Sequence, residues 1–419
     1  MGVECSTVEA NFLKERSEFN VHLSSSEEFT KRNCSSWETM VEEIVAITGG
    51  SGFLAQHLIS CLQQTNHCEV VIVEIRTIDR NSFSKFLDYP SSIPLKHYQF
   101  DICDEDALRV AFNSVTTVFH CAGKSLEYLH DGINHSDKYW RDNTDDQKHK
   151  LKINNLATEI LLKVMHEQRI SRLIHVSDAY AYLPMGDNYG LSEQMHLNFP
   201  NSFMLGLYGQ SKVRAEMYVR RAADKGQINA LILRPTFIYG EGERHLLGSA
   251  LKLCSLYSGI PYLQDDNRGN HQFLYAGNMA AIMKRGMICL KENPEQFNGE
   301  VVICMDCTPC TRFVDFMEPF LKANGLKRVC TISYMQTHLT AIFYEILNRF
   351  ASEKSIGHLT LLANKFINCW TVGFSNRKLR LLLDFVPPYE QSQAVDQSLC
   401  WFRKNRRAGE MFSEATAMI

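Results

Sequence analysis

A glycine-rich turn near the start of the chain constrains its fold more than any other feature. The turn, TGGSGFLA at residues 48–55, follows a short apolar run and precedes a segment whose apolar residues recur at helical spacing. This order predicts a strand, a tight turn and a helix. Gly49 and Gly52 carry no side chain, so the backbone can approach a dinucleotide pyrophosphate at the N-terminus of that helix. A purely structural glycine turn is the alternative.

Later apolar runs repeat the alternation of strands and helices. Short runs at residues 70–73, 97–100, 115–121, 173–176 and 230–233 are separated by helical segments. Such alternation indicates βαβ crossovers and a parallel sheet. We therefore predict an α/β fold with a doubly wound parallel (Rossmann) sheet and a smaller C-terminal substrate lobe of mixed α/β structure. The predicted parts are a loosely ordered extension over 1–40, the dinucleotide-binding domain over 41–240 and the substrate lobe over 241–419.

Composition excludes several classes of function. A formal net charge of -3 gives no electrostatic reason to expect a nucleic-acid partner. The 14 cysteines are scattered along the chain, and the first residues lack the apolar core of a signal peptide, so we interpret the cysteines as reduced thiols. Cys304, Cys307 and Cys310 follow an apolar run, which favours a strand and turn over a metal site. We predict no metal.

Two segments bear on membrane association. The polar residues 1–40 begin with Met1-Gly2-Val3-Glu4-Cys5-Ser6, which fits the pattern for myristoylation of Gly2; an ordinary N-terminus is the alternative. Residues 336–374 are unusually apolar, but charged residues interrupt them, which argues against a transmembrane helix. Two amphipathic helices fit this segment, either lying on a membrane, lining an apolar substrate entrance or packing on the lobe.

Glu74 ends the second apolar run and bears on the identity of the dinucleotide. A carboxylate at this place can accept hydrogen bonds from both ribose hydroxyls and would repel a 2′-phosphate, which favours NAD over NADP. Arg76 keeps NADP open, because an arginine could pair with that phosphate.

The segment Tyr208-Gly209-Gln210-Ser211-Lys212 supplies candidate catalytic groups. Tyr208 and Lys212 are four residues apart, so both lie on one face of a predicted helix. An ammonium group beside a phenol lowers the pKa of the phenol, which makes Tyr208 a proton acceptor for the oxidation of an alcohol. Lys212 can also hold the nicotinamide ribose. An ordinary exposed helical pair is the alternative.

From about residue 43 to residue 405 the chain resembles the extended short-chain dehydrogenase/reductases, and among them the 3β-hydroxysteroid dehydrogenase/isomerase family. The glycine turn and the Tyr208/Lys212 pair carry the broader resemblance. The narrower one rests on LRPTFIYGEG (233–242), FLYAGN (273–278), FSNRK (374–378) and PPY (387–389). Ala55 stands where the dinucleotide pattern has its last glycine, a mild departure because that position serves helix packing.

The resemblance implies an NAD cofactor and roles for individual residues. Tyr208 and Lys212 would be the catalytic pair, and Asn154 would support the active-site helix. The implied cofactor contacts are Gly49, Gly52, Phe53, Leu54, Glu74, Asp101, Ile102, Ala122, Tyr208, Lys212 and Pro235.

One position departs from the family pattern. The family has a Ser or Thr that donates a hydrogen bond to the substrate oxygen, commonly in a Ser-Ser or Ser-Thr pair, whereas this chain has Ser177-Asp178. An ionised carboxylate only accepts hydrogen bonds, and its charge would raise the pKa of Tyr208. Three outcomes are open: Asp178 is protonated and donates, Ser177 takes the role, or catalysis is weak or absent.

These observations together predict an NAD-dependent oxidoreductase that acts on the CH–OH group of a 3β-hydroxysteroid or sterol. We expect it at the cytoplasmic face of an intracellular membrane, the endoplasmic reticulum, with the cytoplasm as the alternative, and we leave a homodimer open. A related reductase or epimerase acting on another lipid or a sugar nucleotide is one alternative, with Arg244, His245 and Arg268 as candidate diphosphate ligands. The other is an NAD-binding protein whose catalysis is impaired by Asp178.

Overall fold

The computed structural model describes residues 43–63, 68–76, 95–124, 145–194, 200, 202–256, 259–263, 268–350 and 361–407. The extension predicted over residues 1–40 and the acylation pattern at Gly2 lie outside the described residues. Both therefore stay predictions.

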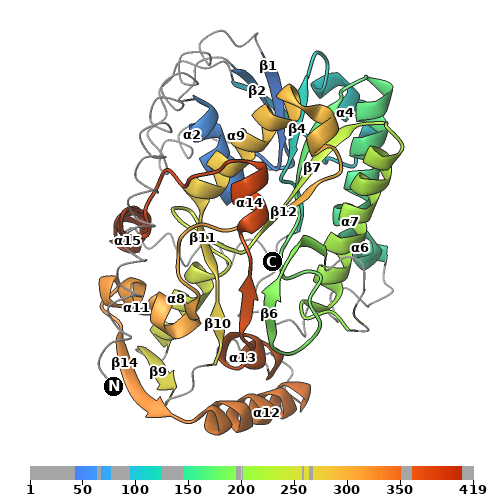
Figure 1. The fold of residues 1–419 in the computed structure, drawn as a ribbon. Coiled ribbons are helices and arrows are strands. Elements are labelled where there is room, and N and C mark those ends of the chain that lie inside the picture. The colour runs from blue at the N-terminus through green and yellow to red at the C-terminus, as the bar shows by residue number, and fades with distance from the viewer. Residues whose placement is uncertain are drawn as a thin grey trace, which may run out of the picture. The chain divides into compact units, whose positions relative to one another are not determined.

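Within the described residues, seven strands form one sheet in the order β12-β7-β5-β4-β1-β2-β3 (Figure 1). β1 pairs with β4, β4 with β5, β5 with β7, β7 with β12 and β2 with β3, all in parallel. The strand order reverses next to β1, where doubly wound sheets open a crevice beyond the carboxyl ends of their strands. The strands are β1 (Glu43–Thr48), β2 (Cys68–Glu74), β3 (Leu95–Gln99), β4 (Thr117–His120), β5 (Arg172–Val176), β7 (Asn229–Pro235) and β12 (Val301–Cys304).

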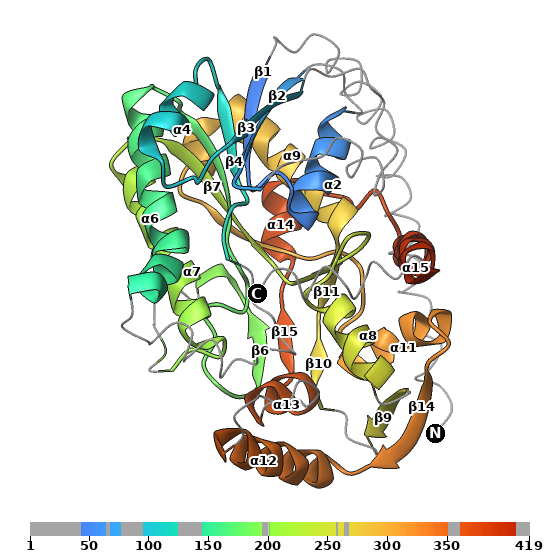
Figure 2. The same cartoon turned by 180° about the vertical axis from the view of Figure 1, so that it is seen from behind.

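Helices cover both faces of this sheet, as Figure 1 and Figure 2 show from opposite sides. On one face α2 packs on α9, which also contacts β5 and β7; on the other face α4, α6 and α7 pack side by side. Strands covered on both faces carry near-continuous apolar residues, which is the pattern of β1, β2 and β5. The predicted doubly wound fold is confirmed. The helices are α2 (Phe53–Gln63), α4 (Glu105–Ala111), α6 (Asp145–Glu167), α7 (Gly206–Asp224) and α9 (Ala276–Glu292).

The predicted domain boundary at residue 240 is wrong in one respect. β12 pairs with β7 at the edge of the main sheet, and α9 covers that sheet, although both come from the segment assigned to the substrate lobe. The cause is the β7 edge, which offers a buried apolar surface that the strand Val301–Cys304 completes. The chain therefore leaves the sheet after β7 and returns to it about sixty residues later.

The remaining elements form a lobe of short strand pairs and helices around an aromatic core. Within the described residues the pairs are β6–β15, β8–β11, β9–β14 and β10–β13. Phe273 stacks on Phe316 with ring centroids 3.7 Å apart, and Tyr180 stacks on Phe237 at 4.5 Å. The strands are β6 (Asn188–Leu191), β8 (Phe237–Tyr239), β9 (Gly259–Leu263), β10 (Asn270–His271), β11 (Phe273–Tyr275), β13 (Thr311–Arg312), β14 (Lys327–Ile332) and β15 (Val372–Phe374). The lobe helices are α8 (Leu247–Leu256), α11 (Phe313–Ala323), α12 (Tyr334–Phe350), α13 (Leu361–Asn368) and α15 (Gln391–Arg407). Two further helices, α10 (Pro294–Phe297) and α14 (Arg377–Leu382), contact the main sheet at β7 and β12.

The apolar segment 336–374 contains the two helices expected of it. They are α12 and α13, which pack on each other, while the last residues of the segment form β15 rather than helix. Among the described residues, no helix combines the length and the apolar character needed to cross a membrane.

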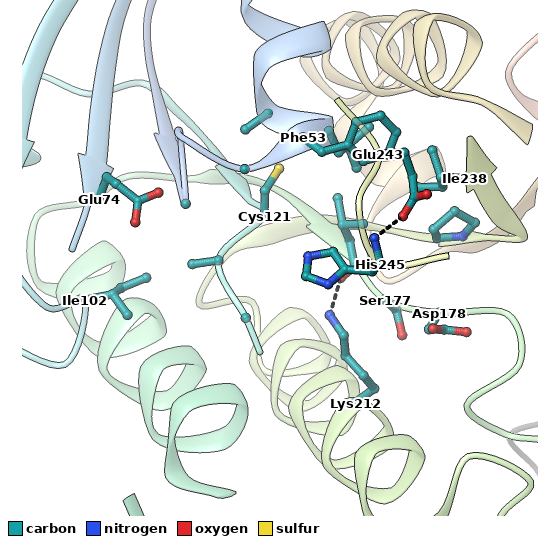
Figure 3. Close-up of a pocket in the computed structure, with 18 of the residues that line it drawn as sticks. Phe53, Glu74, Ile102, Cys121, Ser177, Asp178, Lys212, Ile238, Glu243 and His245 are labelled. Atoms are coloured by element: carbon teal, nitrogen blue, oxygen red, sulfur yellow. Dashed lines mark hydrogen bonds between the residues drawn. The ribbon is translucent and has the colours of Figure 1, made fainter. Parts of the chain in front are cut away.

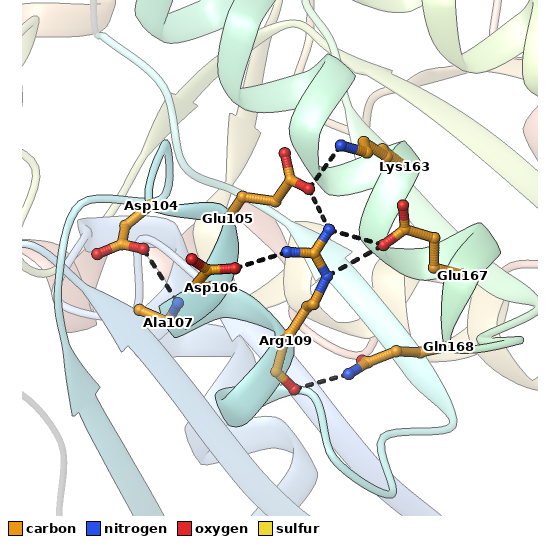
Figure 4. A network of polar contacts seen from close by, with 8 residues as sticks. All are labelled: Asp104, Glu105, Asp106, Ala107, Arg109, Lys163, Glu167 and Gln168. Atoms are coloured by element: carbon orange, nitrogen blue, oxygen red, sulfur yellow. Dashed lines mark hydrogen bonds and ion pairs between the residues drawn. The ribbon is translucent and has the colours of Figure 1, made fainter.

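An ion-pair network joins α4 to α6 on the surface (Figure 4). Arg109 pairs with Asp106 at 2.8 Å and with Glu167 at 2.9 Å, and it also contacts Glu105, which pairs with Lys163 at 2.6 Å. Each of these side chains is at least partly exposed, so water and salt screen their charges. The network orients the two helices but contributes little to the free energy of unfolding.

Candidate active site

A cavity of about 380 Å³ lies beyond the carboxyl ends of the parallel strands (Figure 3). Many of its lining residues lie at the ends of strands of the main sheet. Gly49 follows β1, Glu74 ends β2, Cys121 follows β4, Ser177 follows β5 and Pro235 ends β7. The side chains that the sequence separates by almost 190 residues therefore meet in one place, because parallel strands end at the same edge of a sheet.

The glycine turn is closely packed against the loop after β4. Gly49 has a φ of 70°, and its N–H donates to Val73 O at 2.8 Å. A Cβ atom at this position would lie 2.8 Å from Ala122 Cα, too close for any residue but glycine. The N–H of Gly52 donates to Gly49 O at 2.9 Å, and α2 begins at the next residue. This arrangement leaves the helix N-terminus open to the cavity, which fits the pyrophosphate of a dinucleotide.

Glu74 is anchored at the adenosine end expected for such a ligand. One of its carboxylate oxygens accepts from the N–H of Ser51 at 3.0 Å and from the Ser51 hydroxyl, and the other accepts from the N–H of Ile75 at 3.0 Å. Burial acts to raise the pKa of Glu74, but the hydrogen bonds from Ser51 and the charge of Arg76 outweigh it and lower the pKa. Glu74 is therefore ionised at neutral pH. The Arg76 side chain is 53% exposed and contacts Glu74 at 3.4 Å.

The structure brings the predicted site residues together with one exception. Asn154 does not line the cavity; it accepts from the N–H of Lys124 at 2.9 Å and donates to Ser211 Oγ at 2.9 Å. It thus ties α6 to α7, as a supporting residue would. The predicted residues that line the cavity are Gly49, Gly52, Phe53, Leu54, Glu74, Asp101, Ile102, Ala122, Ser177, Asp178, Tyr208, Lys212 and Pro235.

Asp178 is hydrogen-bonded to the hydroxyl of Tyr208. The Tyr208 hydroxyl donates to Asp178 Oδ2 at 3.2 Å, while Asp178 Oδ1 accepts from the N–H of Tyr180 at 2.8 Å. Burial raises the pKa of Asp178 to about 6, against the opposing effects of the Tyr180 N–H and Lys212. Burial and the Asp178 carboxylate raise the pKa of Tyr208 well above its ordinary value. This is the opposite of the direction expected from Lys212 alone.

Lys212 extends along the cavity wall toward the end of β5 (Figure 3). Its ammonium donates to Val176 O at 3.3 Å. Burial lowers the pKa of Lys212, and the charge of Asp178 opposes that shift.

The hydroxyl of Ser177 is directed to a buried ion pair. It donates to Glu216 Oε2 at 2.7 Å, and the same carboxylate binds Arg234 through two hydrogen bonds of 2.5 Å and 3.0 Å. Both charged side chains are 0% exposed, and the Arg234 guanidinium lies 3.9 Å from the centre of the Tyr182 ring. The Ser177 hydroxyl proton is therefore already donated to Glu216. This argues against Ser177 as the hydrogen-bond donor to a substrate oxygen.

Sequence reasoning missed Glu243 as a cavity residue. Glu243 is buried and accepts from the N–H groups of His245 at 2.6 Å, Leu246 at 2.7 Å and Leu247 at 2.6 Å, which caps the start of α8. This cap holds the ring of His245 in the cavity wall (Figure 3). The signal in the sequence is an acidic residue four positions before the first residue of α8. Of the three residues considered as diphosphate ligands, His245 lines the cavity, whereas Arg244 and Arg268 do not.

Comparison with known proteins gives one family and a common fold. The model of the 3-beta hydroxysteroid dehydrogenase/isomerase family matches residues 46–335. A 3 beta-hydroxysteroid dehydrogenase/Delta 5-->4-isomerase from Vaccinia virus (strain Ankara) is 23% identical over 86% of this chain and 99% of its own length. A decarboxylating sterol-4-alpha-carboxylate 3-dehydrogenase from Candida albicans is 24% identical over 86% of this chain and 98% of its own.

The fold also recurs in solved structures of low sequence identity. The UDP-glucuronic acid 4-epimerase from Bacillus cereus, solved with UDP-glucuronic acid and NAD, superposes with a TM-score of 0.61. The match covers 86% of this chain and 99% of the epimerase at 18% identity, which is a likeness of fold.

Proposed function

Because the chain belongs to the 3-beta hydroxysteroid dehydrogenase/isomerase family, we propose that its cavity binds NAD and oxidises the 3β-hydroxyl group of a sterol or steroid. The family predicted from the sequence is confirmed, and with it an oxidoreductase. One observation carries the proposal further: a single cavity contains the glycine turn, Glu74 and the side chains of Tyr208 and Lys212. The two relatives described above, which span most of this chain, are named for acting on 3β-hydroxysteroids and sterols.

The residues of the cavity fit a dinucleotide, and different residues would contact its different parts. Gly49 and Gly52 would admit the pyrophosphate, Glu74 and Asp101 would face the adenosine, and Pro235 and Lys212 would lie near the nicotinamide. NAD, when bound, supplies a hydride acceptor. The chain's own contributions would be to orient the alcohol beside that acceptor, to exclude water and to remove the hydroxyl proton through the Tyr208 hydroxyl, which lines the cavity.

The direct test is a substrate screen with purified protein. Reduced cofactor is followed by its absorbance while NAD is offered with 3β-hydroxysterols, 3β-hydroxysteroids, their 3α epimers or UDP-sugars. The proposal predicts turnover of the 3β alcohols and none of their 3α epimers. Turnover of a UDP-sugar alone would favour the epimerase alternative. Tight NAD binding without turnover of any alcohol would favour the alternative of an NAD-binding protein whose catalysis is impaired by Asp178.

Exchange of Glu74 for Gln should weaken the preference for NAD over NADP. The change keeps hydrogen-bonding groups but removes the charge that would repel a 2′-phosphate, and we expect the ratio of the two dissociation constants to fall by about tenfold, ~1.4 kcal/mol. The fluorescence of bound NADH and NADPH measures both constants. Glu105→Gln removes a carboxylate outside the cavity and should leave the ratio as it is. An unchanged ratio in Glu74→Gln would remove the basis for choosing NAD.

We also propose that α12 is the surface by which the protein rests on a membrane. Large apolar side chains on this helix are exposed at intervals of three and four residues, so they form one outward stripe. Apolar side chains in such a stripe are expected to insert at the boundary of headgroups and acyl chains. The cytoplasmic face of the endoplasmic reticulum stays a prediction. The stripe comprises Met335 (60% exposed), Leu339 (58%), Phe343 (57%), Ile346 (50%) and Leu347 (44%).

Sedimentation with phosphatidylcholine vesicles tests this surface. The double variant Leu339→Glu/Phe343→Glu should lower the bound fraction by about tenfold or more, because two charges would enter the apolar boundary. Leu381→Glu is the matched control, since Leu381 is 72% exposed on α14 and belongs to no stripe. Equal binding by the wild type and the double variant would exclude α12 as the contact.

A further inference from the structure

We propose that Asp178 is a catalytic residue and takes up the proton when the alcohol is oxidised, with the Tyr208 hydroxyl relaying it. This inference rests on the proposed function, because it concerns the same cavity and the same reaction. It assigns a positive role to the residue that stands where the family has a Ser or Thr. Tyr208 remains neutral before and after each turnover.

Each carboxylate oxygen of Asp178 accepts from a different donor, and one of the donors is the Tyr208 hydroxyl. Oδ1 is engaged by the N–H of Tyr180 at 2.8 Å, so the orientation of the carboxylate is fixed. Oδ2 is 3.2 Å from the Tyr208 hydroxyl, which is the donor of that hydrogen bond. Both residues line the cavity although Asp178 is only 8% exposed and Tyr208 only 6%. A proton can therefore pass from Tyr208 to Asp178 without movement of either side chain.

The charges around the pair favour ionisation of the carboxyl group over that of the phenol. Asp178 faces Tyr208 and Lys212 from α7 and the N–H groups of Tyr180 and Ala181 from its own loop. Burial raises its pKa to about 6, close to neutrality, where a general base is most effective. The pKa of Tyr208 is raised well above its ordinary value by the same burial and by Asp178. A phenolate beside this carboxylate would place two negative charges in one buried site.

The neighbouring groups do not offer an equivalent acceptor. The Ser177 hydroxyl donates to Glu216, and the Lys212 ammonium donates to Val176 O. Cys121 also lines the cavity, but burial raises the pKa of its thiol to about 12. Compared with these three side chains, the Asp178 carboxylate is thus the base available at neutral pH.

The proposed step balances protons and electrons. NAD, when bound, would accept the hydride formed as the C3–H bond of the alcohol breaks, so the alcohol would be oxidised to a ketone and the cofactor reduced. The alcohol O–H bond breaks, and its proton binds the Tyr208 oxygen. The proton that Tyr208 held forms an O–H bond with Asp178 Oδ2. Asp178 then releases this proton to solvent after product leaves.

A spectroscopic titration of the protein without cofactor tests the assignment independently of turnover. The chain has 16 tyrosines, so the phenolate absorbance of Tyr208 is isolated by subtracting the titration of Tyr208→Phe. In the wild type we expect Tyr208 to ionise only above pH ~10. In Asp178→Ser the pKa of Tyr208 should fall by at least about one unit, because the neighbouring charge is gone. Ionisation of wild-type Tyr208 near neutral pH, or an identical titration in Asp178→Ser, would overturn the proposal whether or not a substrate is known.

The dependence of turnover on pH supplies a second readout. Wild-type turnover should fall as the pH drops through about 6, because Asp178 becomes protonated and can no longer accept. Asp178→Asn should lose about 10²- to 10⁴-fold in kcat while it binds NADH as tightly as the wild type. In Asp178→Ser the pH below which turnover falls should be higher than in the wild type, since Tyr208 must then ionise.

A rise of turnover above wild type in Asp178→Ser at neutral pH would contradict a catalytic role, because it would mean that Asp178 hinders the reaction. Failure of every alcohol in the wild type, with the expected titration, would count against the proposed substrate and not against the shared proton site.

Discussion

The variant Glu216→Gln should lose about 3–5 kcal/mol in its free energy of unfolding. Glu216 and Arg234 are both 0% exposed, and the carboxylate also accepts from the Ser177 hydroxyl. A neutral amide would leave the guanidinium of Arg234 buried without a counter-charge, which costs more than the loss of one hydrogen bond. Chemical denaturation followed by circular dichroism measures the loss.

Two comparisons isolate the buried charge as the cause. The double variant Glu216→Leu/Arg234→Met removes both charges and should be more stable than Glu216→Gln, because no unpaired ion remains. Glu167→Gln makes the same chemical change in the exposed network of Figure 4, where Glu167 is 40% exposed, and should cost at most about 1 kcal/mol. Equal losses in Glu167→Gln and Glu216→Gln would contradict the account of the buried pair.

The variant Tyr208→Phe should lose about 10²- to 10⁴-fold in kcat for the 3β alcohol. The change deletes only the hydroxyl, which is the group in the cavity that can exchange a proton with both the alcohol and Asp178. Packing of the ring is retained, so the dissociation constant of NADH should change by no more than about twofold. Steady-state kinetics and cofactor fluorescence measure the two quantities separately.

A second tyrosine variant controls for the loss of a buried hydroxyl. Tyr239 is 0% exposed on β8 and does not line the cavity, so Tyr239→Phe should keep kcat within about threefold of the wild type. If Tyr208→Phe and Tyr239→Phe retained the same kcat, Tyr208 would have no part in proton transfer.

The fold and the position of the site follow from patterns that lie close together in the sequence. The glycine turn between an apolar run and a helix predicts β1 and α2, and the later apolar runs predict the parallel sheet. Because parallel strands end at one edge, residues such as Glu74, Ser177 and Pro235 could be assigned to one site before their distances were known. Tyr208 and Lys212 joined them through the spacing of a helix.

What the sequence could not predict depends on contacts between distant residues. Glu216 resembles any carboxylate on a polar helix until Arg234 is seen against it, because helical spacing does not reveal a partner on β7. β12 was assigned to the wrong part, since a four-residue apolar strand carries no signal for the edge that it joins. The sequence sets the effect of Lys212, which lowers the pKa of Tyr208, against that of Asp178, which raises it, and it does not show the burial that, with Asp178, determines the direction.

The most direct test of the central claim follows the hydrogen atom itself. Purified protein is incubated with NAD and a 3β-hydroxysterol that carries deuterium on C3, and the reduced cofactor is examined by mass spectrometry. Direct transfer in this cavity predicts deuterium in NADH formed by the wild type, in an amount equal to the ketone produced, and almost none with Tyr208→Phe. Ketone formed without deuterium in NADH, or no ketone from any 3β-hydroxysterol, would contradict the account.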